Sequence, residues 1–66
     1  MRGTIIEFDE EVGLGQVRAD AGSIYPFHCT QIADASRTIE MGAIVDFAII
    51  PAHLGRWEAA AITPAD

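Results

Sequence analysis

Glycine and proline residues interrupt this chain at short and fairly even intervals, which leaves no room for the longer βαβ units of parallel sheets. Between the interruptions lie segments rich in β-branched, aromatic and other apolar residues, as in short antiparallel strands. We expect strands at 2–8, 13–19, 24–29, 43–50 and 56–62, with a helical turn at 31–33 and a loop that ends at Gly42. The pattern predicts an all-β fold, a five-stranded antiparallel barrel, because a small open sheet would leave unpaired edges.

The size of the chain limits it to one module. With 66 residues it is long enough for a single domain and too short for two, so residues 1–66 are taken as one unit. Half of the residues are hydrophobic, which supports a packed core, and the one cysteine, Cys29, has no intramolecular partner for a disulfide. We therefore expect a reducing, cytoplasmic location, without an export signal or a membrane span.

Two neighbouring segments show the alternation that separates a buried face from an exposed one. Residues 20–23 are small and polar, as in a tight hairpin turn, so 13–19 and 24–29 are expected to pair. The apolar alternation then predicts an outward set, which is Leu14, Gln16, Pro26 and His28, with Arg18 on the same side. The predicted interior set is Val17, Tyr25, Phe27, Val45 and Phe47.

Several motifs occur in an order and spacing that match a known family. They are Gly3-Thr4-Ile5 with Phe8, Gly13-Leu14-Gly15-Gln16-Val17, Tyr25-Pro26-Phe27-His28, Thr30 to Ile32, and Thr38-Ile39-Glu40 with Gly42, Val45 and Phe47. Together they resemble the cold-shock domain family, small OB-type barrels that bind single-stranded DNA or RNA. The resemblance covers nearly the whole chain. It implies an OB-type barrel whose outward aromatic side chains stack on successive bases.

The chain departs from the family at most of these stacking positions. By alignment with the family, Glu7 replaces the exposed tryptophan, Leu14 and Gln16 replace the two phenylalanines of the first RNP motif, and Val12 replaces its lysine. Pro26 replaces the phenylalanine of the second motif and Cys29 the aromatic residue after the histidine, whereas His28 is kept. Stacking contributes roughly 1–3 kcal/mol per base. The resemblance therefore implies weak binding.

A candidate binding set follows from the outward face and from nearby cationic and aromatic residues. Arginine pairs well with phosphate, and tryptophan serves as a stacking platform or as a protein contact. Trp57 is equally compatible with partial burial in the core. The predicted set is Leu14, Gln16, Arg18, Pro26, His28, Arg56 and Trp57.

Charge supports a second hypothesis. Four arginines and no lysine face ten acidic residues, a formal net charge of -6, which on average slows the approach of nucleic acid. The alternative is a protein-interaction module on an OB barrel that has lost its stacking face. The acidic run 9–11 repels nucleic acid, recognises a basic protein surface or is simply a solvated turn, and His53 is expected in a solvated loop.

No residue pattern indicates catalysis. Cys29 and His28 are adjacent donors without a third metal ligand in register, and no base or oxyanion donor accompanies them. We expect Cys29 to act as a small, half-buried apolar residue. The sequence predicts no enzyme activity, no catalytic residue, no metal and no cofactor.

Overall fold

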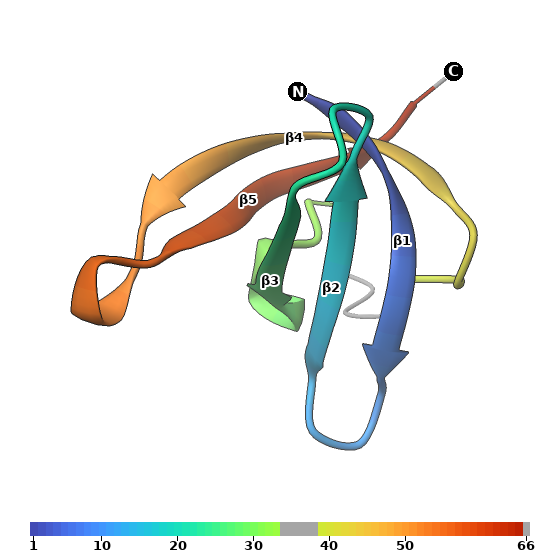
Figure 1. The fold of residues 1–66 in the computed structure, drawn as a ribbon. Helices are drawn as coiled ribbons and strands as arrows, with labels where there is room; N and C mark the ends of the chain where they lie inside the picture. Colours follow the sequence, from blue (N-terminus) through green and yellow to red (C-terminus); the bar gives the residue numbers. More distant parts are fainter. Residues whose placement is uncertain (34–38, 66) are drawn as a thin grey trace.

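The protein folds into one antiparallel sheet. The computed structural model describes residues 1–33 and 39–65, and the side chain of His53 lies outside that description. The strands are β1 (Arg2–Asp9), β2 (Leu14–Ala19), β3 (Ile24–His28), β4 (Ile44–Pro51) and β5 (Trp57–Pro64), with short 3-10 turns η1 (Cys29–Gln31) and η2 (His53–Gly55). Their order in the sheet is β3-β2-β1-β4-β5 (Figure 1). The predicted all-β, five-stranded antiparallel architecture is confirmed.

The predicted helical turn at 31–33 is wrong by two residues. The turn η1 covers Cys29–Gln31 because His28 caps it, with the ring Nδ1 accepting a hydrogen bond from the Thr30 amide at 3.4 Å. Ile32 then leaves the turn in an extended conformation and forms a parallel bridge with Ile62. Part of the loop predicted to end at Gly42 falls on residues 34–38, outside the described residues.

Two irregularities bend the sheet. The register between β1 and β2 shifts between Ile5 and Glu7, and the register between β4 and β5 shifts between Asp46 and Ala48. Such bulges sharpen the bend and the twist of the strands that carry them. Figure 1 shows the result, with β4 and β5 running across one end of the β1–β3 meander and the tip of their hairpin projecting on the side of β3.

The sheet is not closed into a barrel by a backbone ladder. Its two outer strands, β3 and β5, lie in contact, but no ladder pairs them in the part of the chain that the structure describes. Pro26 stands in the middle of β3, and proline, which has no N–H to donate, is tolerated in sheets mainly at edges. The closed barrel expected from the sequence is therefore not confirmed.

The core lies on the concave side of the sheet and contains the residues predicted for it. Val17, Phe27, Val45 and Phe47 are buried, and Tyr25 packs half-buried against them. The remaining buried core residues are Ile5, Ala19, Ile32, Ala59 and Ile62. Each large apolar side chain that is fully buried contributes about 1.5–3 kcal/mol. The period-two alternation therefore assigned these faces correctly.

Close packing at the centre of β2 requires a glycine. A Cβ atom on Gly15 would lie 2.5 Å from Cζ of Phe27, well inside van der Waals contact. With no Cβ atom there, the Phe27 ring fits against Gly15 and stacks on Phe8, with ring centroids 6.0 Å apart. The glycine thus fixes where the phenylalanine of β3 sits.

An exposed ion pair joins β1 to β4. Arg2 Nε lies 3.2 Å from Asp46 Oδ1, and this hydrogen bond and the carboxylate charge raise the pKa of Arg2. Both side chains are about half exposed, so the pair adds little to stability. Among the described residues, no helix has the length and apolar character needed to cross a bilayer.

Candidate nucleic-acid interface

The ladder between β2 and β3 brings the predicted outward residues together. Leu14 lies opposite His28, and Gln16 lies opposite Pro26. Directly opposite residues of an antiparallel pair project from the same face. Leu14, Pro26 and His28 are exposed and Gln16 is half-buried, whereas their neighbour Phe27 is buried on the other face. Their predicted placement on one solvent-facing surface is confirmed.

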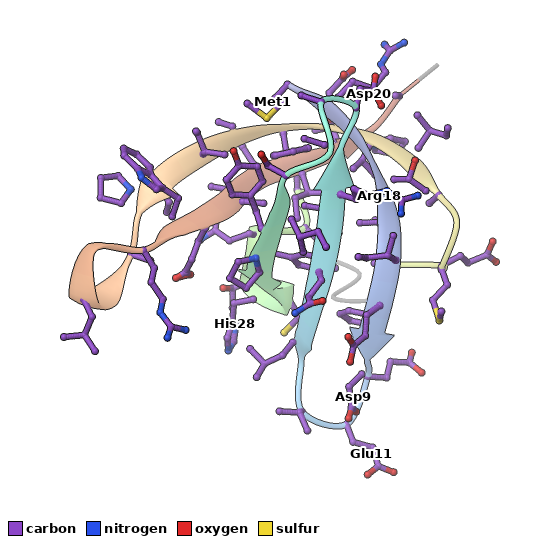
Figure 2. All side chains as sticks on the ribbon, viewed as in Figure 1. Met1, Asp9, Glu11, Arg18, Asp20 and His28 are labelled. Atoms are coloured by element: carbon purple, nitrogen blue, oxygen red, sulfur yellow. The ribbon has the colours of Figure 1, made fainter. Side chains whose placement is uncertain are left out.

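Strand β1 extends this surface with acidic residues. Glu7 lies opposite Gln16 and Asp9 opposite Leu14, so each row of the face ends in a carboxylate on β1. Figure 2 shows Asp9 at the end of β1, with Glu11 beyond it in the β1–β2 turn. The β1 border of the face is therefore anionic and repels phosphate.

On its other side the face adjoins the β4–β5 hairpin, where a first hollow of about 330 Å³ forms. Its apolar walls come from Leu14, Pro26 and Ala52. The polar side chains His28, Arg56 and Glu58 complete the lining. A mostly apolar recess with a few polar groups is the usual form of a ligand site.

A second hollow of about 430 Å³ lies beside the first. It is lined by Gln16, Ile24, Tyr25, Pro26, Arg56 and Trp57. Pro26 and Arg56 line both hollows, so the two hollows adjoin each other at these residues. Trp57 is 51% exposed there, so the structure favours a contact residue over a core residue.

Six of the seven predicted site residues line these hollows, and Arg18 is the exception. It lies opposite Ile24 on β3 and Thr4 on β1, two rows away from His28. Figure 2 shows the Arg18 side chain on the β1 side of the sheet, with His28 on the far side of β2. The structure does not bring Arg18 to the hollows.

The arginines differ in their availability for an anionic ligand. Arg2 is paired with Asp46, but in residues 1–33 and 39–65 no carboxylate forms an ion pair with Arg18 or Arg56. An unpaired guanidinium can form two parallel hydrogen bonds to a phosphate. Because Arg56 lines both hollows, it is the cation best placed to hold a phosphate there.

His28 has a structural contact on one side of its ring and lines the first hollow. Its Nδ1 accepts from the Thr30 amide and lies 3.2 Å from Thr30 Oγ1. In the neutral ring, Nδ1 as acceptor leaves the proton on Nε2, which is then a donor. The side chain therefore serves both as the cap of η1 and as part of the surface.

Cys29 lies half-buried beside the core, as predicted, and its Sγ is 3.9 Å from His28 Nδ1. Gly13 leaves space for this thiol, because a Cβ atom on it would lie 2.8 Å from Sγ. Within the described part of the chain, no group of three or more histidine, cysteine or acidic side chains could hold a metal ion. The side chain of His53, predicted to be solvated, lies outside the described residues.

Sequence reasoning missed Glu58. It follows Arg56 by two residues, and alternation along a strand puts residues two apart on the same face. That spacing was the available signal, but the sequence does not show which residues of the neighbouring strand lie opposite the last strand. The structure fixes the register by pairing Ile50 with Glu58 and Pro51 with Trp57.

Comparison with known proteins adds no relative. No protein-family model matches this chain, and no curated protein matches it. The cold-shock resemblance therefore rests on the motifs of the sequence, and the following proposals rest on the geometry of the surface.

Proposed function

We propose that this chain is a cold-shock-like module of the OB type that binds single-stranded DNA or RNA weakly, without catalysis. The observation that carries the proposal is the convergence of Leu14, Pro26 and His28 with Trp57 and Arg56, which has no ion pair within the described residues, around two adjacent hollows. With its one cysteine unbridged, a reducing cytoplasmic location belongs to the same proposal.

The barrel is proposed from contacts between the outer strands. β3 and β5 touch, and Ala33 N–H donates to the Ile62 carbonyl at 2.9 Å, which ties the segment after η1 to β5. These contacts bring the two edges of the sheet together over the core, although no continuous ladder joins them within residues 1–33 and 39–65. The result is the curved surface on which OB-type proteins hold a strand.

The binding mechanism combines stacking with backbone pairing. Trp57 and Leu14 are each about half exposed and offer apolar contact to a base, and Arg56 offers a guanidinium to a phosphate. Stacking on a ring is worth roughly 1–3 kcal/mol per base, and this face offers one tryptophan in place of several aromatic rings. Together with the repulsion from Glu7 and Asp9, this small number of platforms predicts weak affinity.

A second candidate function, docking of a polypeptide, is favoured by one feature. Large apolar side chains are exposed at the β4–β5 hairpin, where Leu54 is 85% exposed and Ile50 and Trp57 are also accessible. Exposed large apolar and aromatic side chains on a projecting hairpin are typical of protein interfaces. In this alternative, the OB-type scaffold has exchanged its nucleic-acid ligand for a protein partner.

A fluorescence titration tests the nucleic-acid proposal. Trp57 is the single tryptophan of the chain and lines the second hollow, so its emission reports on occupancy. A mixed-sequence strand of about eight nucleotides, a length within the range one OB fold covers, is titrated at about 50 and 200 mM salt. We expect saturable quenching in the micromolar range that weakens with salt, and little response to duplex of the same sequence. No response at high strand concentration would refute nucleic-acid binding and favour the protein-docking alternative.

A further inference from the structure

Among the described residues that line the two hollows, Glu58 is the one acidic side chain. It is half-buried in the first hollow beside the apolar walls formed by Leu14 and Pro26. No hydrogen bond or ion pair engages its carboxylate within the described residues, and Arg56, on the same strand segment, is not ion-paired with it. A ligand in this hollow therefore meets an acceptor that no other part of the described protein uses.

The chemistry of a carboxylate restricts what can lie against it. An ionised carboxylate only accepts hydrogen bonds, so it repels a phosphate and requires a donor from its ligand. Cytosine, adenine and guanine carry exocyclic amino groups that donate, whereas thymine and uracil donate only from N3, which lies between two carbonyl oxygens that a carboxylate repels. The first hollow is thus suited to an amino-bearing base, and Arg56 is suited to the adjoining phosphate.

We propose that Glu58 selects an amino-bearing base in the first hollow, so that the protein prefers cytosine, adenine or guanine to thymine or uracil. This inference rests on the proposed function, since it concerns the ligand of the same surface. The base lies against Leu14 and Pro26 and donates from its amino group to the Glu58 carboxylate. A thymine in the same position would place its O4 oxygen against that charge.

The experiment compares two pyrimidine strands with the same sugar-phosphate backbone. Cytosine presents an amino group to Glu58 where thymine presents its O4 oxygen. Fluorescently labelled oligo-dC and oligo-dT of about eight nucleotides are titrated by anisotropy at neutral pH and about 50 mM salt. A good hydrogen bond to a base edge discriminates between the right and the wrong base. We therefore expect oligo-dC to bind about tenfold more tightly than oligo-dT. Equal binding of the two strands would overturn the inference and leave the proposed function intact, whereas no binding of either strand would overturn both.

Substitutions assign the preference to Glu58. In Glu58→Gln the amide both donates and accepts, so we expect binding of oligo-dT to improve and the ratio of affinities to fall close to one. Glu11→Gln is the matched control, because it removes the same charge from an exposed turn outside the hollows and is expected to keep the ratio. Circular dichroism checks that both variants fold. If Glu58→Gln does not fold, Glu58→Asp, which withdraws the carboxylate by one methylene, is expected to lower the ratio several-fold. An unchanged ratio in the folded variant would overturn the inference.

Discussion

Restoring aromatic side chains at Glu7 and Gln16 should strengthen single-strand binding. The two residues lie directly opposite each other on β1 and β2, and Gln16 lines the second hollow beside Pro26. In the double variant Glu7→Trp, Gln16→Phe, each new ring is a stacking platform worth roughly 1–3 kcal/mol. The stacking contributions of neighbouring rings are not additive. We therefore expect at least the gain of a single ring, which is an increase in affinity of about tenfold. Removal of the Glu7 charge acts in the same direction.

Anisotropy of a labelled strand is the appropriate assay, because the emission of a second tryptophan would overlap that of Trp57. The control is Met41→Phe, which adds an exposed ring at a residue that lines neither hollow and should leave the affinity unchanged. Both sites of the double variant lie on the outer face, so its stability should change by less than about 1 kcal/mol. Unchanged or weaker binding by the folded double variant would refute the placement of the binding face.

Three further outcomes follow from the structure. Phe27→Ala should lower the free energy of unfolding by about 3–5 kcal/mol, since the ring is 1% exposed, and a urea titration that shows a loss below about 1 kcal/mol would contradict its place in the core. Gly15→Ala should cost about 1–3 kcal/mol in the same measurement, because the new methyl group overlaps the Phe27 ring, and unchanged stability would be inconsistent with that packing. Arg56→Ala should weaken strand binding and reduce the slope of log affinity against log salt by about one. Arg18→Ala, outside the hollows, should change the affinity and the slope less. Equal effects of the two substitutions would argue against a special role for Arg56.

The faces of β2 and β3 could be predicted because local rules decide them. The short polar turn at 20–23 makes the two strands neighbours, and period-two alternation then assigns Val17 and Phe27 to the core and Leu14 and His28 to the surface. A shift of one residue would have exposed the whole apolar set. The burial of these side chains thus specifies the register strongly.

The position of the β4–β5 hairpin could not be predicted, because it depends on irregularities that have no clear sequence signal. Two features redirect the strands: the bulge between Asp46 and Ala48 and the left-handed backbone of Ala61, with φ of 52°. The residue types at these places do not indicate such a conformation. These features decide which residues of β5 reach the outer face of β2 and β3. For this reason the sequence indicated Arg56 and Trp57 as candidates but did not identify Glu58 or separate Arg18 from them.

The most direct test of the central claim is to map strand binding on the amide resonances of the protein. If the two hollows form the binding surface, addition of a single strand of about eight nucleotides should shift the amides of Leu14, His28 and Glu58 and the indole N–H of Trp57 along one saturable curve. Residues on the opposite end of the sheet, such as Ile44, should move little. Shifts centred on Ile44 and its neighbours, or no shifts at saturating strand concentration, would contradict the account.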